Sequence, residues 1–226
     1  MLRLALFDCD GTLVDSEYAI AAAMRDAFGA LGILPPAASA IRANIGLSVQ
    51  AAVRALTPNL GEDVRARLAE AYRDAYFQHR TAAASAPEPL FDGILDVLDQ
   101  LRGAGWQLGI ATGKSMRGLT RLLDAHGIGD YFATLQTADM HPSKPDPAMA
   151  LAALDQCLVE PGHGVMIGDT SFDMGCARGA GMAAIGVGWG YHNADALRAA
   201  GAMAIAEDPA DLPGLINDIL CQRMQS

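Results

Sequence analysis

Short apolar runs alternate with longer amphipathic stretches along most of the chain. The runs have the length and aliphatic content of buried strands. They comprise Leu2–Phe7, Trp106–Ala111, Phe132–Gln136, Gly164–Ile167, Ala183–Val187 and Ala202–Ala206. Most of them are followed by a loop with Gly or Asp and then by a helical pattern. This alternation predicts an α/β fold, a Rossmann-like parallel sheet with helices on both faces.

One long stretch after the first strand breaks the alternation. Between Val14 and about Pro89 the pattern favours helices alone, with prolines between them. The helical segments are Ser16–Leu31, Ser39–Ile45, Ser48–Leu56 and Asp63–Ala82. The sequence therefore predicts an α/β core of residues 1–15 and 88–226, with an all-helical domain of residues 16–87 inserted after the first strand.

Composition and charge exclude several classes of protein. The chain has 226 residues, 51% of them hydrophobic and 19% charged, which excludes wholesale disorder. No uncharged apolar run approaches the roughly 18 residues of a membrane span, and the mean hydropathy of +0.19 comes largely from alanine. The net charge of −10 argues against a nucleic-acid partner, because binding a phosphate backbone needs a basic surface.

The cysteines and the N-terminus indicate where the protein works. Four cysteines occur, with neither metal-ligand spacing nor a dense disulfide framework. The first residues lack the long apolar stretch and cleavage site of a signal peptide. We therefore expect a reduced, cytoplasmic protein, and the sequence leaves open whether it is a monomer or a homodimer.

Four of the predicted strands lead into loops that carry acids, a threonine or a lysine. In an open parallel sheet, ligands bind outside the carboxyl ends of the strands. The side chains that we expect to converge there are Asp8, Asp10, Thr112, Lys144, Asp169 and Asp173. Taken singly, each has a plainer interpretation: an acid can cap a helix, and Lys144 can be a solvated loop charge. The ordered set is much harder to obtain by chance.

So many carboxylates at one sheet edge require neutralisation. Two unit charges 4 Å apart repel by about 4 kcal/mol at an effective dielectric constant near 20. Several such pairs would exceed a folding stability of about 5–15 kcal/mol. Hard oxygen ligands without His or Cys select Mg²⁺, which shares its coordination sphere with water and substrate phosphate. The sequence predicts a Mg²⁺ site.

Four segments resemble the sequence motifs of haloacid-dehalogenase-superfamily phosphatases, and they occur in the family's order. Asp8–Ser16 resembles the first motif and Ala111–Lys114 the second. Lys144–Pro147 resembles the third motif, and Gly168–Met174 the fourth. The resemblance covers the whole chain, and the helical insert is similar to the family's C1-type cap.

The resemblance implies a role for each motif residue. Asp8 would attack phosphorus and become an aspartyl phosphate, and Asp10 would act as general acid and then as general base. Thr112, Gly113 and Lys144 would hold the phosphoryl oxygens, and Lys144 would also offset the repulsion between Asp8 and phosphate. The metal ligands would be Asp8, the backbone carbonyl of Asp10, Asp169 and, directly or through water, Asp173.

Departures from other branches of the superfamily narrow the activity. Asp10 is present, unlike in dehalogenases, and the insert has no lysine for the Schiff base of a phosphonoacetaldehyde hydrolase. Ile20 stands where β-phosphoglucomutases carry a histidine. The chain therefore resembles the phosphoglycolate-phosphatase-like branch, which acts on a small phosphorylated metabolite. The alternatives are an inorganic pyrophosphatase, a β-phosphoglucomutase-like phosphotransferase, or a non-catalytic binding module on the same fold.

Selectivity for the substrate is expected from the insert and from one residue of the core. By position, Arg42, Asn44 and the loop from Gly46 to Ser48 are the candidates in the insert. Lys114 either reaches the non-reacting end of the substrate or is a surface lysine at a helix start.

Overall fold

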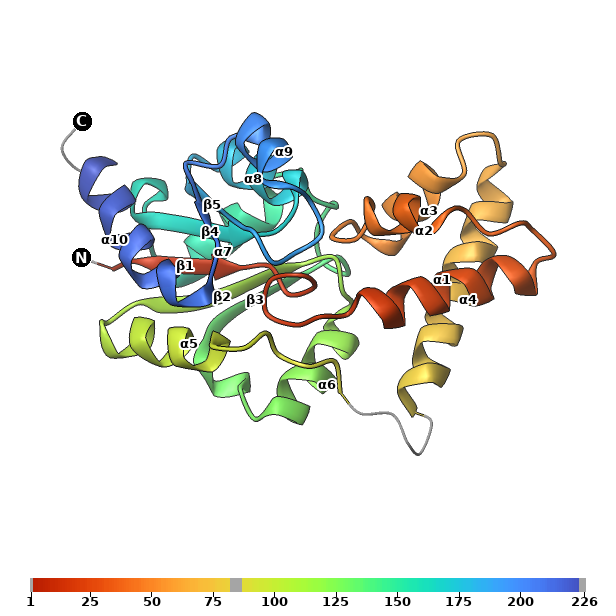
Figure 1. Cartoon of the computed structure of the whole chain (residues 1–226), viewed down its shortest axis with the longest axis horizontal. Coiled ribbons are helices and arrows are strands. Elements are labelled where there is room, and N and C mark those ends of the chain that lie inside the picture. Colours follow the sequence, from red (N-terminus) through yellow and green to blue (C-terminus); the bar gives the residue numbers. More distant parts are fainter. Residues whose placement is uncertain (1, 82–86, 224–226) are drawn as a thin grey trace.

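The computed structural model describes residues 2–81 and 87–223, and they form an α/β core with a helical lobe at one end (Figure 1). The lobe holds the first four α-helices, which lie between strands β1 and β2. We call these four helices and their connecting loops the cap, and the rest of the chain the core. None of the helices in the described residues is both long and apolar enough to cross a membrane.

The core is built on a parallel sheet of six strands in the described residues, in the order β3-β2-β1-β4-β5-β6. The strands are β1 (Leu4–Phe7), β2 (Gln107–Thr112), β3 (Phe132–Thr137), β4 (Gly164–Gly168), β5 (Ala183–Val187) and β6 (Ala204–Ala206). Each predicted strand is present, with ends displaced by up to two residues. The predicted α/β fold with a parallel sheet is confirmed.

Helices cover both faces of the sheet because their apolar sides pack on its two buried surfaces. One hydrophobic cluster joins one face to α5 (Ile94–Gly103), α6 (Met116–His126) and α10 (Leu212–Arg223). A second cluster joins the other face to α7 (Ala148–Cys157), α8 (Ser171–Gly179) and α9 (Ala194–Ala200). With both faces covered, polar chemistry is confined to the ends of the strands.

The cap has a hydrophobic core of its own. Its helices are α1 (Glu17–Ala30), α2 (Ala38–Arg42), α3 (Val49–Leu56) and α4 (Glu62–Thr81). The predicted end of the last helix at Ala82 lies outside the described residues. A separate cluster of buried side chains fills the space between these helices, and it includes Tyr191 from the core. Tyr191 is therefore a residue of the core whose side chain packs inside the cap.

Candidate active site

The strand register brings the motif residues to one edge of the sheet. Phe7 of β1 lies level with Ile110 of β2 and Ile167 of β4. The next residue, Asp8, is still held by the sheet, because its N–H donates to the carbonyl oxygen of Ile167 at 2.8 Å. Thr112 ends β2 two residues beyond the level of Phe7. Polar side chains from neighbouring strands therefore meet where the sheet ends.

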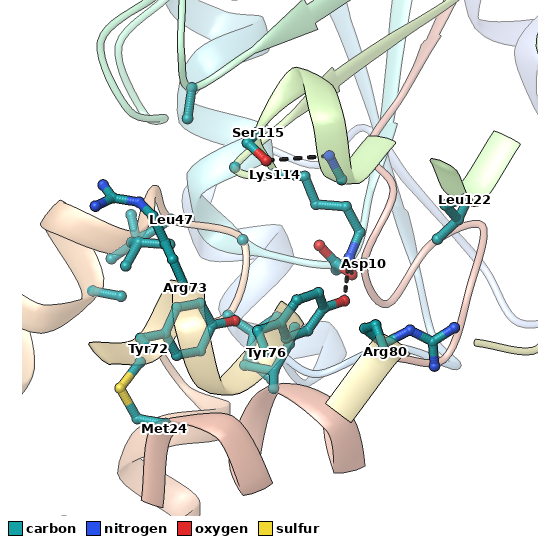
Figure 2. A pocket seen from close by; sticks show the side chains of 18 of the residues that line it. Asp10, Met24, Leu47, Tyr72, Arg73, Tyr76, Arg80, Lys114, Ser115 and Leu122 are labelled. Carbon is teal, nitrogen blue, oxygen red and sulfur yellow. Dashed lines mark hydrogen bonds and ion pairs between the residues drawn. The ribbon is translucent and has the colours of Figure 1, made fainter. Parts of the chain in front are cut away.

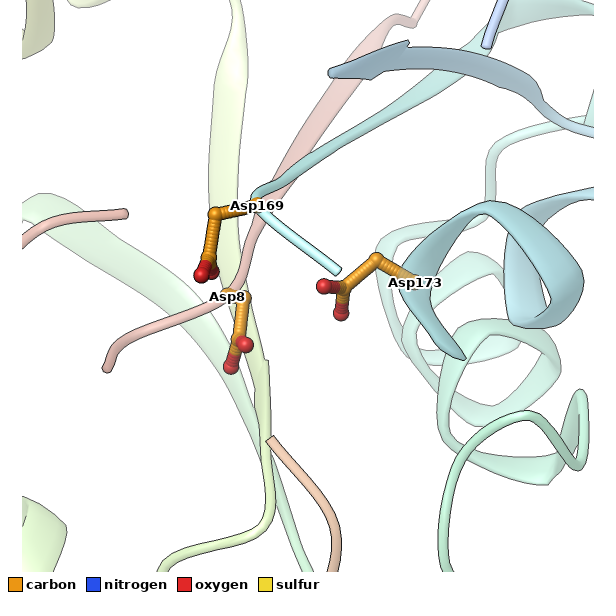
Figure 3. A group of neighbouring side chains, drawn as sticks. All are labelled: Asp8, Asp169 and Asp173. Atoms are coloured by element: carbon orange, nitrogen blue, oxygen red, sulfur yellow. The ribbon is translucent and has the colours of Figure 1, made fainter. Parts of the chain in front are cut away.

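Three carboxylates form a compact group there, which we call the acidic centre (Figure 3). Asp8, Asp169 and Asp173 are fully buried, and each offers an oxygen within 4.8 Å of those of the other two. Asp8 follows β1, Asp169 follows β4, and Asp173 lies in the first turn of α8. Hard oxygen donors in this arrangement are suited to a divalent cation.

The two oxygens of Asp8 have different surroundings. Oδ1 accepts from the N–H of Cys9 at 2.7 Å and lies 2.8 Å from the ammonium of Lys144. Oδ2 is buried and has no hydrogen-bond partner among the described residues. Burial raises the pKa of Asp8 well above its usual range, and Lys144 opposes this effect. A bound cation or phosphoryl group would provide the partner that Oδ2 lacks.

Asp169 is held by two donors from other loops. Its Oδ1 accepts from the hydroxyl of Thr12 at 3.0 Å, and its Oδ2 accepts from the N–H of Tyr191 at 3.0 Å. A Cβ at Gly190 would lie 2.1 Å from the Cβ of Asp169, so only glycine allows this loop to approach so closely. Burial and the neighbouring Asp173 raise the pKa of Asp169 to about 7.

Asp173 is oriented by its own helix. The N–H and the hydroxyl of Thr170 donate to its Oδ2 at 3.0 and 2.6 Å, and the Thr170 side chain in turn caps α8. Its Oδ1 accepts from Lys144 at 2.6 Å. Both oxygens of Asp173 thus already accept hydrogen bonds from neighbouring groups.

Lys144 lies fully buried between two of the acids. Its ammonium bridges Asp8 and Asp173 and also donates to the carbonyl oxygen of Ala111 at 3.2 Å. Burial by itself would lower the pKa of Lys144, but the two carboxylates raise it above its usual range, so the side chain stays charged. The alternative of a solvated loop charge is wrong, because the side chain is 0% exposed.

Asp10 belongs to a second chain of polar groups, which runs from the core into the cap (Figure 2). Its Oδ1 accepts from the hydroxyl of Ser16 and lies 2.7 Å from the ammonium of Lys114. The same ammonium donates to the hydroxyl of Tyr76 at 3.0 Å, and that hydroxyl donates to Glu88 at 2.5 Å. The Lys114 side chain is only 9% exposed, so the surface-lysine alternative is wrong.

The loop after β2 lies directly against the cap. The buried hydroxyl of Thr112 accepts from the N–H of Lys114 at 3.2 Å, which leaves its proton for another acceptor. A Cβ at Gly113 would lie 2.4 Å from the backbone oxygen of Leu47 in the cap. Glycine is therefore needed at this position for the two lobes to meet.

The four cap residues proposed for selectivity fall into two groups. Asn44 and Gly46 line the cavity between cap and core, together with Lys114 from the core. Arg42 instead donates to the carbonyl oxygens of Gly190 and Tyr191 at 2.9 and 3.3 Å and pairs with Glu17.

Ser48 is also used at the junction between the two lobes. It caps α3, and its N–H donates to the hydroxyl of Ser143 at 2.8 Å. The structure thus places Arg42 and Ser48 at the cap–core contact rather than in the cavity lining.

Comparison with known proteins agrees with this geometry. The sequence profile of the family described as "Haloacid dehalogenase-like hydrolase" matches residues 5–187. This chain belongs to that family. A protein of Dickeya dadantii named "Probable phosphatase IndB" is 36% identical over 97% of this chain and 96% of its own length. A "Phosphoglycolate phosphatase" of Pseudomonas putida is 33% identical over 94% of this chain and 79% of its own.

A solved structure has the same overall fold as this chain. The crystal structure of a hydrolase from Pseudomonas syringae aligns with a TM-score of 0.84 and 28% identity, over 96% of this chain and 99% of the other. The predicted family, the fold and the enzyme class, a hydrolase of this family, are confirmed. The acidic centre fits the divalent-metal site of the haloacid dehalogenase-like hydrolases.

Sequence reasoning missed two tyrosines of this haloacid dehalogenase-like hydrolase. Tyr191 follows β5, so the rule that directed attention to the loops after the other strands would have found it. Its hydroxyl accepts from the N–H of Ser16 at 3.0 Å. Tyr76 lies on the inner side of α4 and carries no motif, so its contact with Lys114 was not detectable.

Proposed function

We propose that this hydrolase is a Mg²⁺-dependent phosphatase that hydrolyses a small phosphate monoester through an aspartyl phosphate on Asp8. The observation that carries the proposal is the environment of Asp8. One of its oxygens is fixed by Lys144 and by the N–H of Cys9, while the other is buried without a partner among the described residues. A carboxylate with one oxygen held in place and the other without a partner can act as a nucleophile.

In the first step, Asp8 forms a bond to phosphorus and the bond between phosphorus and the ester oxygen breaks. Asp10 gives its proton to the departing alkoxide, which leaves as the alcohol. In the second step, water attacks phosphorus, the bond to Asp8 breaks and inorganic phosphate is released. Asp10 takes the proton of the attacking water and is ready for another cycle.

The remaining motif residues would orient the phosphoryl group. Lys144 is charged and lies 2.8 Å from Asp8, so it offsets the repulsion between this carboxylate and the incoming phosphate. The hydroxyl proton of Thr112 and the backbone at Gly113 lie at the same edge of the sheet and would donate to phosphoryl oxygens.

The residues that would hold the cation are Asp8, Asp169 and the backbone carbonyl of Asp10. Both oxygens of Asp173 already accept hydrogen bonds, which favours its contact through water. The crowded acids, with the raised pKa values of Asp8 and Asp169, fit a cation that would stabilise their charged forms. When bound, Mg²⁺ supplies a positive charge that neutralises phosphoryl oxygens.

The substrate class follows from the relatives. The Pseudomonas putida relative is named for phosphoglycolate, which makes this ester the first to test. The four cysteines are all free, and free cysteines are usual in compartments that keep thiols reduced. We propose the cytoplasm as the compartment.

Release of inorganic phosphate in the presence of Mg²⁺ tests the proposal. The panel should contain phosphoglycolate, p-nitrophenyl phosphate, pyrophosphate and β-glucose 1-phosphate, with Asp8→Asn as the control. We expect hydrolysis of monoesters and a labelled phosphoenzyme in rapid-quench samples. Conversion of β-glucose 1-phosphate to its 6-phosphate without release of phosphate would instead identify a mutase. Binding of esters without turnover would identify a binding module.

A further inference from the structure

The cavity between the two lobes begins at the general-acid residue and extends into the cap. Its volume is about 400 Å³, and Asp10 is part of its wall. We call it the cap cavity. Sites for drug-sized ligands occupy roughly 300–1,000 Å³. The leaving group of an ester whose phosphorus lies at Asp8 would extend into this space, because Asp10 has to reach the ester oxygen.

The inner wall of the cap cavity is aliphatic. It is formed in part by residues of the cap's own hydrophobic core, which are only 2–4% exposed: Met24, Ile41 and Ile45. Leu47, Ala52 and Leu56 extend this wall. Such a surface offers water almost no hydrogen-bond partners, so a polar leaving group of two carbons would leave most of it uncovered.

A second wall is aromatic. Tyr72 and Tyr76 of α4 stack on each other, with ring centroids 5.8 Å apart and an angle of 27° between the planes. Figure 2 shows the side chain of Lys114 reaching Tyr76, and its ammonium lies 5.3 Å from the centroid of that ring. Aromatic side chains in a cavity wall favour contact with a further ring, in offset-stacked or edge-to-face geometry.

The charged groups of the cap cavity border its aromatic residues, because Lys114 lies over the Tyr76 ring and Arg117 lies over the ring of Phe77. Five of the lining residues are cationic and three are acidic: Arg73, Arg80, Lys114, Arg117 and Arg121 against Asp10, Glu88 and Asp139. The acids are already bound by Lys114, by Tyr76 and by the N–H of Met116. In a chain of net charge −10, this local excess of positive charge would attract an anionic ester.

We infer that the natural substrate is a phosphate monoester whose leaving group is an apolar alcohol carrying a ring, seated in the cap cavity against Tyr72 and Tyr76. The inference rests on the proposed phosphatase activity and specifies its substrate. The phosphate binds at the acidic centre, and the ring replaces water along the aliphatic wall. Phosphoglycolate, which has two carbons and a carboxylate, fills little of this space.

Two esters with alcohols of similar basicity test the inference without changing the chemistry of the leaving group. The wild-type enzyme is assayed with ethyl phosphate and with 2-phenylethyl phosphate, with phosphoglycolate as a third substrate. We expect kcat/KM for the phenylethyl ester to exceed that for ethyl phosphate and for phosphoglycolate at least tenfold, which corresponds to about 1.4 kcal/mol. A single methylene in an apolar pocket can contribute roughly that factor.

Variants that fill the cap cavity locate the effect. Ala52→Phe should lower the ratio of the phenylethyl to the ethyl kcat/KM tenfold or more, and Leu56→Phe serves if the first variant does not fold. Leu151→Phe is the matched control, because Leu151 is an exposed residue of the core outside the cavity, and it should keep the wild-type ratio.

The outcomes separate this inference from the proposed function. If kcat/KM for phosphoglycolate or for ethyl phosphate equals that for the phenylethyl ester, the enzyme is a phosphatase but the inference is wrong. A ratio that is unaffected in a folded cavity-filling variant also overturns it. If no ester is hydrolysed, including p-nitrophenyl phosphate, the proposed function fails first and the inference falls with it.

Discussion

The acidic centre and the cap cavity differ in how rigidly they hold their charged groups. In the acidic centre, Lys144 and the hydroxyls of Thr12 and Thr170 hold fully buried carboxylates with few degrees of freedom. The cap cavity is mostly apolar and carries its cations on long side chains, three of which are exposed. The first arrangement suits one group of fixed shape and charge, and the second suits a variable body. The proposed reaction and the proposed selection of the substrate would therefore depend on different physical interactions.

The largest effect is expected from the acidic centre at Asp8. Asp8→Asn keeps the shape of the side chain but removes the nucleophile, so turnover of every ester should fall about 10⁴-fold or more. Phosphate release measures the loss, and an unchanged far-UV circular dichroism spectrum shows that the fold persists. A variant that kept a tenth of the wild-type rate would remove Asp8 from the mechanism.

Asp10 lies where the two regions meet, and its loss should depend on the leaving group. Asp10→Asn should slow hydrolysis of alkyl phosphates by about 10²–10⁴-fold, because the departing alkoxide needs a proton. The phosphorylation step with p-nitrophenyl phosphate should suffer less, since nitrophenolate leaves without one. Rapid-quench measurement of phosphoenzyme formation compares the two. Equal losses for both esters would contradict a role for Asp10 as the acid.

Metal binding should stabilise the acidic centre and, through it, the whole fold. Mg²⁺ at a hundred times its Kd should raise the free energy of unfolding by about 2.7 kcal/mol. For a chain of this size, each kcal/mol shifts Tm by roughly 2–4 °C. Differential scanning fluorimetry with Mg²⁺ or with EDTA, at matched ionic strength, measures the shift. Asp169→Asn should reduce it, and full phosphatase activity in EDTA would contradict the metal requirement.

The rise in Tm caused by Mg²⁺ should increase with pH, because the proposed metal ligand Asp169 has a raised pKa. Burial and Asp173 raise the pKa of Asp169 to about 7 in the folded protein, against about 3.9 in an unfolded chain. Between these values the folded state binds more protons, so metal-free stability falls as the pH rises through this window. A cation requires the charged carboxylate, so the gain in Tm from Mg²⁺ should be larger at pH 8 than at pH 5.5. Equal gains at both values would contradict this assignment.

The smallest effect is expected from Tyr76, the cap residue whose hydroxyl lies between Lys114 and Glu88 of the core. Tyr76→Phe removes the hydroxyl between Lys114 and Glu88 but keeps the aromatic wall. Two buried charges each lose a partner, which should cost about 1–2 kcal/mol of stability in urea unfolding. Tyr131→Phe is the control, because that hydroxyl binds Asp99 at the surface and its loss should cost less than about 0.5 kcal/mol. Equal losses would indicate that the Tyr76 hydroxyl is not energetically coupled to Lys114.

The sequence was most informative where chemistry and strand position coincide. The strand ends were predictable to within two residues, because buried runs and loop glycines are local signals. Asp8, Asp169 and Lys144 could be assembled because each follows a strand of one parallel sheet. The structure now shows the contacts that bring Asp8, Asp169 and Lys144 together, including the hydrogen bonds of Asp169 to Thr12 and Tyr191.

The helices of the cap could be predicted from the sequence, but the side chains that they present to the core could not. Which side of α4 faces the core depends on how four helices pack, and the sequence alone does not give that arrangement. The burial of Lys114 is a consequence of this packing, since Tyr76 and Glu88 enclose its side chain only in the folded protein. For the same reason Arg42 was named as a candidate for substrate selectivity, although its guanidinium contacts the loop at Gly190 and Tyr191.

The position of Tyr191 has a consequence for exchanging caps between related enzymes. Its side chain packs in the hydrophobic core of the cap, although it belongs by sequence to the loop after β5. A chimera that transplants only the segment between β1 and β2 would leave a foreign aromatic ring, or an unfilled hole, in the centre of the new lobe. The module that evolution or an engineer must move together is therefore discontinuous, and it includes the few residues around Tyr191 that also hold Asp169.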